Sequence, residues 1–496
     1  MSAGEPLLSP SHCDERTITA FSGFNKEELK KVLYIFWPVS ASEVLQFLSY
    51  AITTAQVGHI GSAELSAITL GRSIYHITGL SLVIGTAVGV RTLGGQAFGA
   101  QQYSLLGTVA KRAILINLLL CFLIFLAWTQ LTPLMINLGQ DPALASLAVR
   151  YILGIFPALL ADSVIYCLQG YLTCQAMVAP LMIIAGVSVI TTPCANYLYL
   201  NVYHMGIDGA ALALVTVKLM TLLLTLLAVW WVGSFLQEDS KKTWPSWSLD
   251  CLKGWDQYLR VSLPSMAMVC ASWWIFEAVI LIAGKGENAA VQLPVMGILF
   301  SLHSLVFMLN AGFSAAASTR VSNLLGEGRG NLAQGSMLLC IMLSSCIDLA
   351  CCFGLLIWNT PVSEVFSSDP SVVSSTVKAM PWMVLSLLLD GCNEVLGGVL
   401  VGSGRQSLGF LTKLLCYWFV GLPLAWLWGS QRGAVGMWQA LSAVTVVQTI
   451  LLGGSVARFD WDAEARRAEI RVLEGVRSMS DLRTALKPKE TEHYEP

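Results

Sequence analysis

The chain of 496 residues has the composition of an integral membrane protein. Apolar and aromatic residues make up 55% of it and charged residues only 12%, and the mean hydropathy is +0.66. These values exclude an ordinary soluble domain. The net charge of −2 is close to neutral, so the composition does not indicate a nucleic-acid partner.

Twelve apolar segments of membrane-spanning length follow one another along the chain. A hydrocarbon core about 30 Å thick requires about 20 mostly apolar residues per crossing helix. The predicted helices are 33–56, 67–92, 113–136, 147–171, 178–201, 209–234, 257–284, 290–316, 334–360, 376–402, 408–430 and 433–455. Because no strand-and-turn pattern competes with this one, the expected fold class is an all-α integral membrane protein.

The chain repeats itself once. Residues 141–172 align with 369–400 without a gap, and ten of the 32 positions are identical, including Asp162 with Asp390. A second match pairs TLGGQAFG (92–99) with TRVSNLLG (319–326). This repeat indicates two homologous halves, each with six of the predicted helices.

An even number of crossings in each half brings both halves into the membrane from the same side. We therefore expect two six-helix lobes related by a pseudo-two-fold axis along the membrane normal, an arrangement typical of secondary transporters. The predicted domains are an N-terminal segment (1–32), an N-terminal lobe (33–234), an inter-lobe linker (235–256), a C-terminal lobe (257–455) and a tail (456–496). Two covalently joined lobes can work as a monomer.

The basic residues of the connections predict the orientation. With both termini in the cytosol, the inner side carries Lys111, Arg112, Lys241, Lys242, Arg320, Arg329, Arg405 and Lys413, and the outer side carries Arg150, Lys285, Lys378 and Arg432, with Arg72 at its edge. The positive-inside rule favours this arrangement. The sequence leaves open whether the protein lies in the plasma membrane or in a vacuolar or other endomembrane.

Three acids inside predicted C-terminal spans are the first candidates for function: Glu277, Asp390 and Glu394, the last two one helical turn apart. A carboxylate near the bilayer centre is costly when charged, so it must be neutral, paired, hydrated in a cavity, or alternate among these states. If a proton and a cationic substrate compete for the same carboxylates, their movements are coupled without covalent chemistry.

Aromatic side chains next to Glu277 form a second group of candidates. Trp273, Trp274 and Phe276 lie on the same predicted helix, and aromatic faces beside a negative charge suit a flat organic cation through cation–π contact. The alternative is that the tryptophans pack against lipid or neighbouring helices.

Two acids of the N-terminal half are further cavity candidates. Asp162 is the repeat counterpart of Asp390 and indicates a matching site in the N-terminal lobe, although a single acid can also serve a structural role. Glu43 follows Pro38, which can kink the first helix. Glu43 is expected either to line the N-terminal cavity or to pair with Lys218.

Catalytic, metal and nucleotide sites have no support in the sequence. The six histidines are scattered singly without HExxH, the thirteen cysteines form no CxxC pair, and TLGGQAFGAQ lacks the preceding strand and the GK[ST] of a phosphate loop. We expect no enzyme activity, no bound metal and no cofactor other than the coupling ion.

Several motifs together resemble the multidrug and toxic compound extrusion (MATE) transporters, especially their eukaryotic branch. They are VGHIGSAELSA (57–67), GLSLVIGTAVGVRTLGGQAFGAQ (79–101), STRVSNLLGEG (318–328), GGVLVGSGRQ (397–406) and WWIFEAVIL (273–281).

The resemblance implies an antiporter that exports organic cations, xenobiotics or secondary metabolites in exchange for protons, or for sodium in some branches. It also implies that Glu277 and Asp390 line a C-terminal cavity. Arg91 departs from the pattern, because an acid is expected in that second span. An alternative is a lipid-linked sugar flippase of a related fold, which would need more basic groups in its cavity to bind a pyrophosphate.

Overall fold

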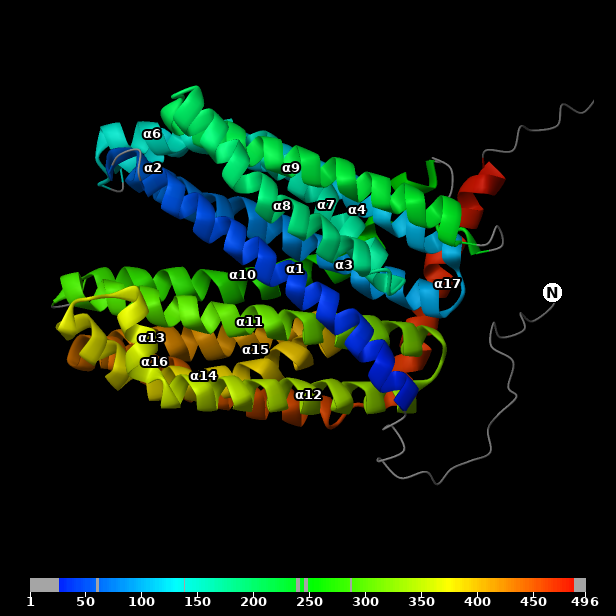
Figure 1. Ribbon diagram of the computed structural model, residues 1–496. Helices are drawn as coiled ribbons and strands as arrows, with labels where there is room; N and C mark the ends of the chain where they lie inside the picture. The colour runs from blue at the N-terminus through cyan, green and yellow to red at the C-terminus, as the bar shows by residue number, and fades with distance from the viewer. Residues whose placement is uncertain are drawn as a thin grey trace, which may run out of the picture.

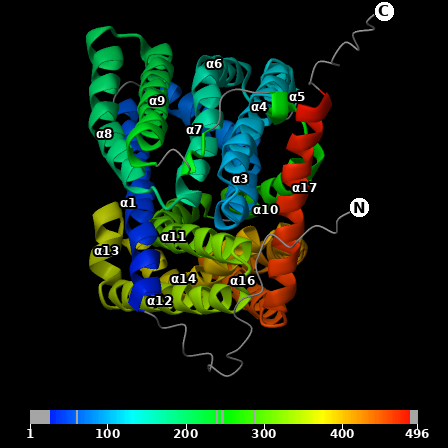
Figure 2. The same ribbon diagram turned by 90° about the vertical axis from the view of Figure 1, so that its right-hand side faces the viewer.

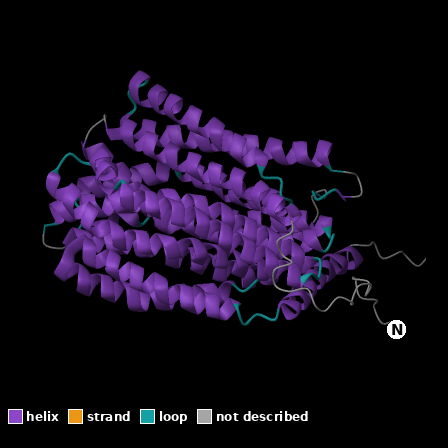
Figure 3. Cartoon of the chain, turned by 60° about the horizontal axis from the view of Figure 1, so that its bottom comes forward, coloured by secondary structure: helices purple, strands orange, loops and turns teal. Residues whose placement is uncertain are grey.

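The computed structural model describes residues 26–58, 62–137, 139–237, 241–244, 249–285 and 288–485. Within these ranges the chain is helical and contains no strand (Figure 3). Most of the predicted N-terminal segment, the linker residues 238–240 and 245–248, and the last eleven residues of the tail lie outside the described residues.

Two helical bundles form the molecule, one above the other in Figure 1. The upper bundle contains α1 (Lys26–Gly58), α2 (Ser62–Tyr75), η1 (His76–Leu80), α3 (Ser81–Gly99), α4 (Tyr103–Trp128), α5 (Leu131–Asn137), α6 (Pro142–Gly154), α7 (Phe156–Cys174), α8 (Ala179–Asn196), η2 (Tyr197–Val202), α9 (Gly206–Trp231) and η3 (Val232–Leu236). The lower bundle contains α10 (Trp255–Lys285), α11 (Ala289–Gly326), α12 (Gly330–Ile357), α13 (Asn359–Phe366), α14 (Pro370–Ser403), α15 (Gln406–Lys413), η6 (Leu414–Gly421) and α16 (Leu422–Val456), preceded by η5 (Leu249–Leu252). These bundles contain the two predicted lobes.

The described helices account for twelve membrane crossings. Ten helical runs are long and apolar enough to cross a membrane, and the pair α6 and α7, bent by 45°, forms an eleventh. One of the ten, Gln406–Val456, has 51 residues, which is about 75 Å of helix and more than twice the thickness of a hydrocarbon core. It breaks at Gly433, whose φ of 60° is left-handed, into two crossings. The predicted all-α fold is confirmed, and the break falls between predicted helices 408–430 and 433–455.

The Asp-Pro pairs of the internal repeat begin two equivalent helices. Asp141 is the N-cap of α6 and accepts a hydrogen bond from the Leu144 backbone N–H at 2.9 Å. Asp369 is the N-cap of α14 and accepts one from the Ser371 backbone at 2.8 Å. A proline at the first helical position completes both caps, because it lacks the N–H that would have no partner there.

The repeated motifs TLGGQAFG and TRVSNLLG pack against each other where the two bundles meet. A Cβ built on Gly99 would lie 2.0 Å from the Asn323 carbonyl oxygen, and one on Gly326 would lie 2.2 Å from the Gln96 carbonyl oxygen. Each glycine therefore admits the backbone of the other motif, and the contact is reciprocal, as expected on a pseudo-two-fold axis. These glycines are needed for close approach of the bundles, not for a phosphate.

Side-chain hydrogen bonds reinforce the same contact. Thr92 donates to the Val401 carbonyl at 2.6 Å and Gln96 to the Gly402 carbonyl at 3.0 Å, so α3 is tied to the end of α14. Farther along, Tyr258 of α10 donates to the Thr86 carbonyl of α3 at 2.8 Å. The two bundles are thus joined at one end and diverge toward the other (Figure 1).

The helix α17 (Trp461–Ala485) lies across the joined end, and Figure 2 shows it running along both bundles. Arg405 of the lower bundle donates to Glu464 at 2.7 Å, and Arg471 donates to Gln96 of the upper bundle at 3.3 Å. We call this the tail end of the molecule. Within the upper bundle α1 packs against α8, and it also contacts α11 of the lower bundle.

Candidate functional site

Asp390 lies in the core of the C-terminal bundle and is paired with a histidine. Its Oδ2 is 2.9 Å from Nε2 of His303 on α11, and the Ser386 hydroxyl, one turn earlier on α14, donates to the same oxygen at 3.4 Å. Both members of the pair are buried. We call Asp390 and His303 the C-lobe pair. The acid is thus held by an imidazole and a hydroxyl, and not by a lysine or an arginine.

Glu277 is half-buried on α10 and is not in contact with the C-lobe pair. Within the described residues it has no hydrogen bond or ion pair of its own. Its neighbour Phe276 provides the connection, because the Phe276 ring lies 5.9 Å from the His303 ring and 5.2 Å from that of Phe300. Glu394, half-buried one turn beyond Asp390, likewise has no bonded partner among the described groups. The three predicted acids lie in one bundle without forming one contact cluster.

The two tryptophans contact the other bundle. Nε1 of Trp274 donates to the Ile77 carbonyl at 3.1 Å and lies 3.2 Å from the Ser81 hydroxyl, both on N-terminal helices. Trp273 packs against the apolar cluster of the N-terminal bundle. Both side chains therefore lie at the interface of the bundles, and a role in cation binding stays a prediction.

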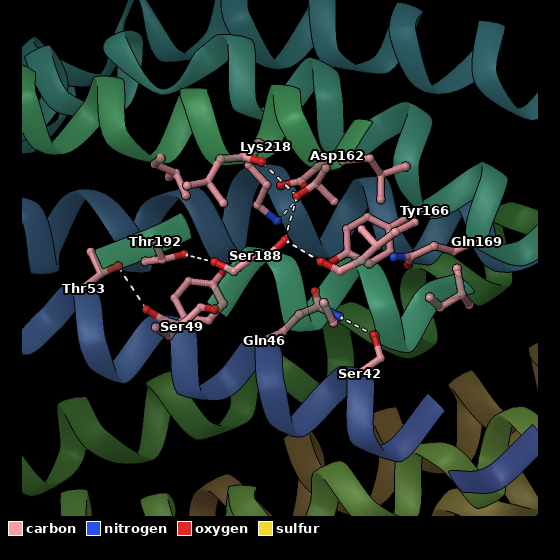
Figure 4. Close-up of a pocket in the computed structure, with 18 of the residues that line it drawn as sticks. Ser42, Gln46, Ser49, Thr53, Asp162, Tyr166, Gln169, Ser188, Thr192 and Lys218 are labelled. Carbon is pink, nitrogen blue, oxygen red and sulfur yellow. Dashed lines mark hydrogen bonds and ion pairs between the residues drawn. The ribbon is translucent and has the colours of Figure 1, made fainter. Parts of the chain in front are cut away.

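The N-terminal bundle contains a cavity of mixed polar and apolar lining between α1, α7, α8 and α9 (Figure 4). Its volume is about 80 Å³, which accommodates several water molecules but not a drug-sized ligand. Hydroxyl and amide side chains supply much of its lining, among them Ser42, Gln46, Ser49, Thr53, Gln169 and Ser188. A substrate would require this cavity to widen.

Asp162 forms a buried ion pair at this cavity. Its Oδ1 is 2.7 Å from Nζ of Lys218, and Tyr75 donates to its Oδ2 at 2.7 Å. The Asp162 side chain is 1% exposed, so these two donors supply the hydrogen bonds that water would otherwise provide. The prediction that Asp162 marks a site in the N-terminal lobe stays open, but it is not an isolated acid.

Glu43 does not pair with Lys218, contrary to one of the two expectations for it. Lys218 is bonded to Asp162, and Glu43 is half-buried on α1 beside the cavity-lining Ser42. Arg91 of α3 and Lys218 interact with Glu43 only by charge. Arg91 therefore contributes a positive charge beside an acid of the first helix, where the family resemblance had suggested an acid.

Sequence reasoning missed Asp348, Asn310 and the role of His303. Asp348 is fully buried on α12 and accepts a hydrogen bond from Asn310 of α11 at 2.7 Å. The internal repeat contained a signal for His303, because it follows His76 by the same 227 residues that separate TLGGQAFG from TRVSNLLG. In the described part of the chain, no three His, Cys, Asp or Glu side chains are placed to hold a metal ion.

A family model, related sequences and a solved structure all match most of this chain. The MatE family model matches residues 38–198 and 264–427. The chain is 31% identical to human multidrug and toxin extrusion protein 1 over 449 residues, covering 90% of this chain and 77% of that protein. It is 32% identical to protein DETOXIFICATION 3 of Arabidopsis thaliana over 473 residues, covering 94% and 98%. The crystal structure of the eukaryotic MATE transporter AtDTX14 superposes with a TM-score of 0.83 at 28% identity, covering 90% of this chain and 99% of that one.

Proposed function

Because this chain belongs to the MatE family of transporters, we propose that it exports small organic cations, xenobiotics or secondary metabolites in exchange for protons. It is a multi-pass membrane protein and not an enzyme. The observation that supports proton exchange is the C-lobe pair, a buried carboxylate held by a histidine instead of a fixed cation.

The proposed exchange follows from the cost of charge in the hydrocarbon layer. A cation that reaches the C-terminal bundle stabilises an ionised carboxylate at Asp390, and a proton stabilises the neutral one. The two passengers therefore compete for one group. Glu277 would attract the cation where the bundles diverge, and Phe276 would offer it an aromatic face close to His303.

Export further requires that the bundles open alternately at their two ends. Basic residues such as Lys111, Arg320 and Arg405 favour a cytosolic tail end, with both termini in the cytosol. The bundles are joined at that end and diverge at the other, so this conformation corresponds to access from outside. Opening toward the cytosol would break the bonds that Thr92 and Gln96 make to α14.

Uptake into proteoliposomes tests the proposal. Vesicles with an acidic interior should accumulate tetraphenylphosphonium faster than vesicles without a pH gradient, because each proton that leaves is exchanged for the cation. Asp390→Asn should remove this acceleration. Asp208→Asn is the matched control, because Asp208 is a surface acid, 43% exposed and paired with Arg150, away from the C-lobe pair.

Three outcomes would contradict the proposal. The first is uptake that ignores the pH gradient, and the second is unchanged gradient-driven uptake by Asp390→Asn. The third is uptake driven by a sodium gradient at equal pH, which would support sodium coupling. A flippase for lipid-linked sugars has no supporting observation, since the unpaired charged groups described in this region, Glu277 and Glu394, are acidic.

A further inference from the structure

Three polar side chains form a closed hydrogen-bonded ring in the interior of the C-terminal bundle. Asn310 donates from Nδ2 to Asp348 Oδ1 at 2.7 Å. The Ser344 hydroxyl lies 3.0 Å from Asn310 Oδ1 and 3.4 Å from Asp348 Oδ2. All three residues are 0% exposed. We call Asp348, Asn310 and Ser344 the Asp348 ring.

The ring touches α14 immediately beside the C-lobe pair. A Cβ built on Gly391 would lie 1.7 Å from Asp348 Oδ2, so the carboxyl group occupies the space that this glycine leaves free. Gly391 directly follows Asp390 in the chain. The carboxyl groups of Asp348 on α12 and Asp390 on α14 are therefore neighbours. Asp348 interacts by charge with Asp390 and with His303, and Asp390 is bonded to His303.

A count of the protons available to the ring favours a neutral Asp348. The ring contains three contacts, and each one needs a proton between its two heavy atoms. Asn310 supplies one N–H to the ring and Ser344 supplies its single O–H. Ser344 lies closer to Asn310 (3.0 Å) than to Asp348 (3.4 Å), so a hydrogen bond across the longer contact needs a third proton from Asp348 itself. The count does not depend on the orientation of the Asn310 amide, because a flipped amide also supplies one donor and one acceptor.

An ionised Asp348 would carry two penalties in this position. Ser344 would have to donate to either Asn310 or Asp348, which leaves one buried acceptor without a full hydrogen bond. In addition, none of the described Lys, Arg or His nitrogens lies within 4 Å of the Asp348 carboxyl to balance its charge. A buried charge without such a partner is strongly disfavoured.

We infer that Asp348 is a second proton carrier of the C-terminal bundle, neutral in this conformation and ionised during the transport cycle. The inference rests on the proposed function, since it adds a proton to the same exchange. The titratable groups that face Asp348 are His303 of α11 and Asp390 of α14, together with the thiols of Cys351 and Cys352 on its own helix. In the step itself only the O–H bond of Asp348 breaks, and its proton passes to water as the cation arrives.

The variant Asp348→Asn separates a proton carrier from a structural residue. Its amide offers one acceptor to Asn310 and one N–H to Ser344, so the ring keeps all three hydrogen bonds and only the ability to release a proton is lost. The full-length protein in weakly buffered detergent is mixed with tetraphenylphosphonium, and the protons released per bound cation are measured with a pH indicator.

We expect Asp348→Asn to release about half as many protons per cation as the wild-type protein, with tenfold or more slower uptake under a pH gradient and unchanged thermal stability. Equal proton release and equal uptake in the variant and the wild type would overturn the inference. Asp208→Asn serves as the control. If the wild type itself releases no proton, or if Asp390→Asn changes nothing, the proposed antiport fails instead.

A measurement on the wild-type protein avoids any dependence on how the variant folds. The infrared difference spectrum with and without tetraphenylphosphonium should show the loss of a protonated carboxyl C=O band when the cation binds. That band should be weaker in Asp348→Asn. A wild-type spectrum without such a band would contradict a neutral acid that ionises during the cycle.

Discussion

Replacement of Lys218 by methionine is predicted to destabilise the N-terminal bundle strongly. Lys218→Met keeps the length of the side chain but leaves Asp162, which is 1% exposed, with Tyr75 as its remaining donor. Breaking a buried ion pair by removing one partner costs about 3–5 kcal/mol, because the other charge stays buried. The equilibrium constant for local opening should therefore rise about a hundred- to several-thousand-fold.

The double variant Lys218→Met with Asp162→Asn should recover most of this loss. It removes both charges, and the amide of the new asparagine still offers an acceptor to Tyr75. Replacing a whole buried pair is often close to neutral, in contrast to removing one partner. The comparison of the single variants with the double variant thus isolates the interaction between the two charges.

Thiol labelling of Cys167 measures the effect. Cys167 lies on α7 five residues after Asp162 and is 0% exposed, so a maleimide reaches it only when the bundle opens locally. The exposed Cys194 and Cys346, the half-buried Cys351 and Cys392, and Cys13, which lies outside the described residues, are first replaced by serine to remove background labelling. If Lys218→Met labels Cys167 at the wild-type rate, or if the double variant labels as fast as the single one, the argument from a buried charge is refuted.

Three further predictions concern the rest of the chain. Gly391→Ala should destabilise the protein by about 1–3 kcal/mol, because the new methyl group overlaps the Asp348 carboxyl. Gly397→Ala should stabilise it by up to about 1 kcal/mol, because no atom lies within 4 Å of the new Cβ. Thermal unfolding in detergent compares the two variants. Glu464→Ala should detach α17 from the lower bundle and speed proteolysis of the tail, and wild-type cleavage rates would contradict the described ion pairs. Asp369→Ala should reduce stability at neutral pH but not at strongly acidic pH. Hydrogen bonds from Ser371 hold the pKa of Asp369 below its usual value, so the stability that Asp369 contributes is present above the unfolded pKa and is lost as pH falls. An equal loss of stability at both pH values would contradict this.

The fold could be predicted from sequence because each crossing helix carries its own signal. Apolar length gave the helices, and the repeat of residues 141–172 at 369–400 gave the equivalence of the halves. Helix ends were less predictable, since α1 begins at Lys26 and α11 continues to Gly326, both beyond the apolar spans. Polar residues such as those of TRVSNLLG continue these helices outside the hydrocarbon layer, where hydropathy carries no information about helix length.

The candidate site was predictable only where a single residue is unusual for its surroundings. An acid in an apolar segment is visible in the sequence, and Asp390 and Asp162 were found in this way. Its partners are not visible, because Lys218 and His303 reach these acids across separate helices and their pairing depends on helix rotation. Asp348 carries the same composition signal as Asp390, but its ring with Asn310 and Ser344 depends on tertiary packing.

The internal repeat shows how the two lobes differ chemically. Asp162 and Asp390 are counterparts in the repeat, and each is bonded to a side chain of another helix, Tyr75 in the N-terminal lobe and His303 in the C-terminal lobe. The geometry of an acid held from a neighbouring helix is therefore common to both lobes. The groups that hold the acid are not, since a phenol stays neutral at physiological pH while an imidazole takes up and releases a proton there.

The remaining group near the acid differs even more between the two lobes. The position equivalent to Lys218 is Thr445, 227 residues later, and its hydroxyl lies 3.1 Å from that of Ser386, which in turn donates to Asp390. In the N-terminal lobe a lysine supplies a permanent positive charge, so Asp162 has little need of a proton or a substrate cation. In the C-terminal lobe the hydroxyl of Thr445 supplies no charge, and the carboxyl group must be balanced by a protonated histidine, a proton or a cation. We therefore expect the C-terminal lobe to be the half in which a proton and a cationic substrate exchange, and pH-gradient-driven uptake should persist in the double variant that lacks both Lys218 and the Asp162 carboxylate.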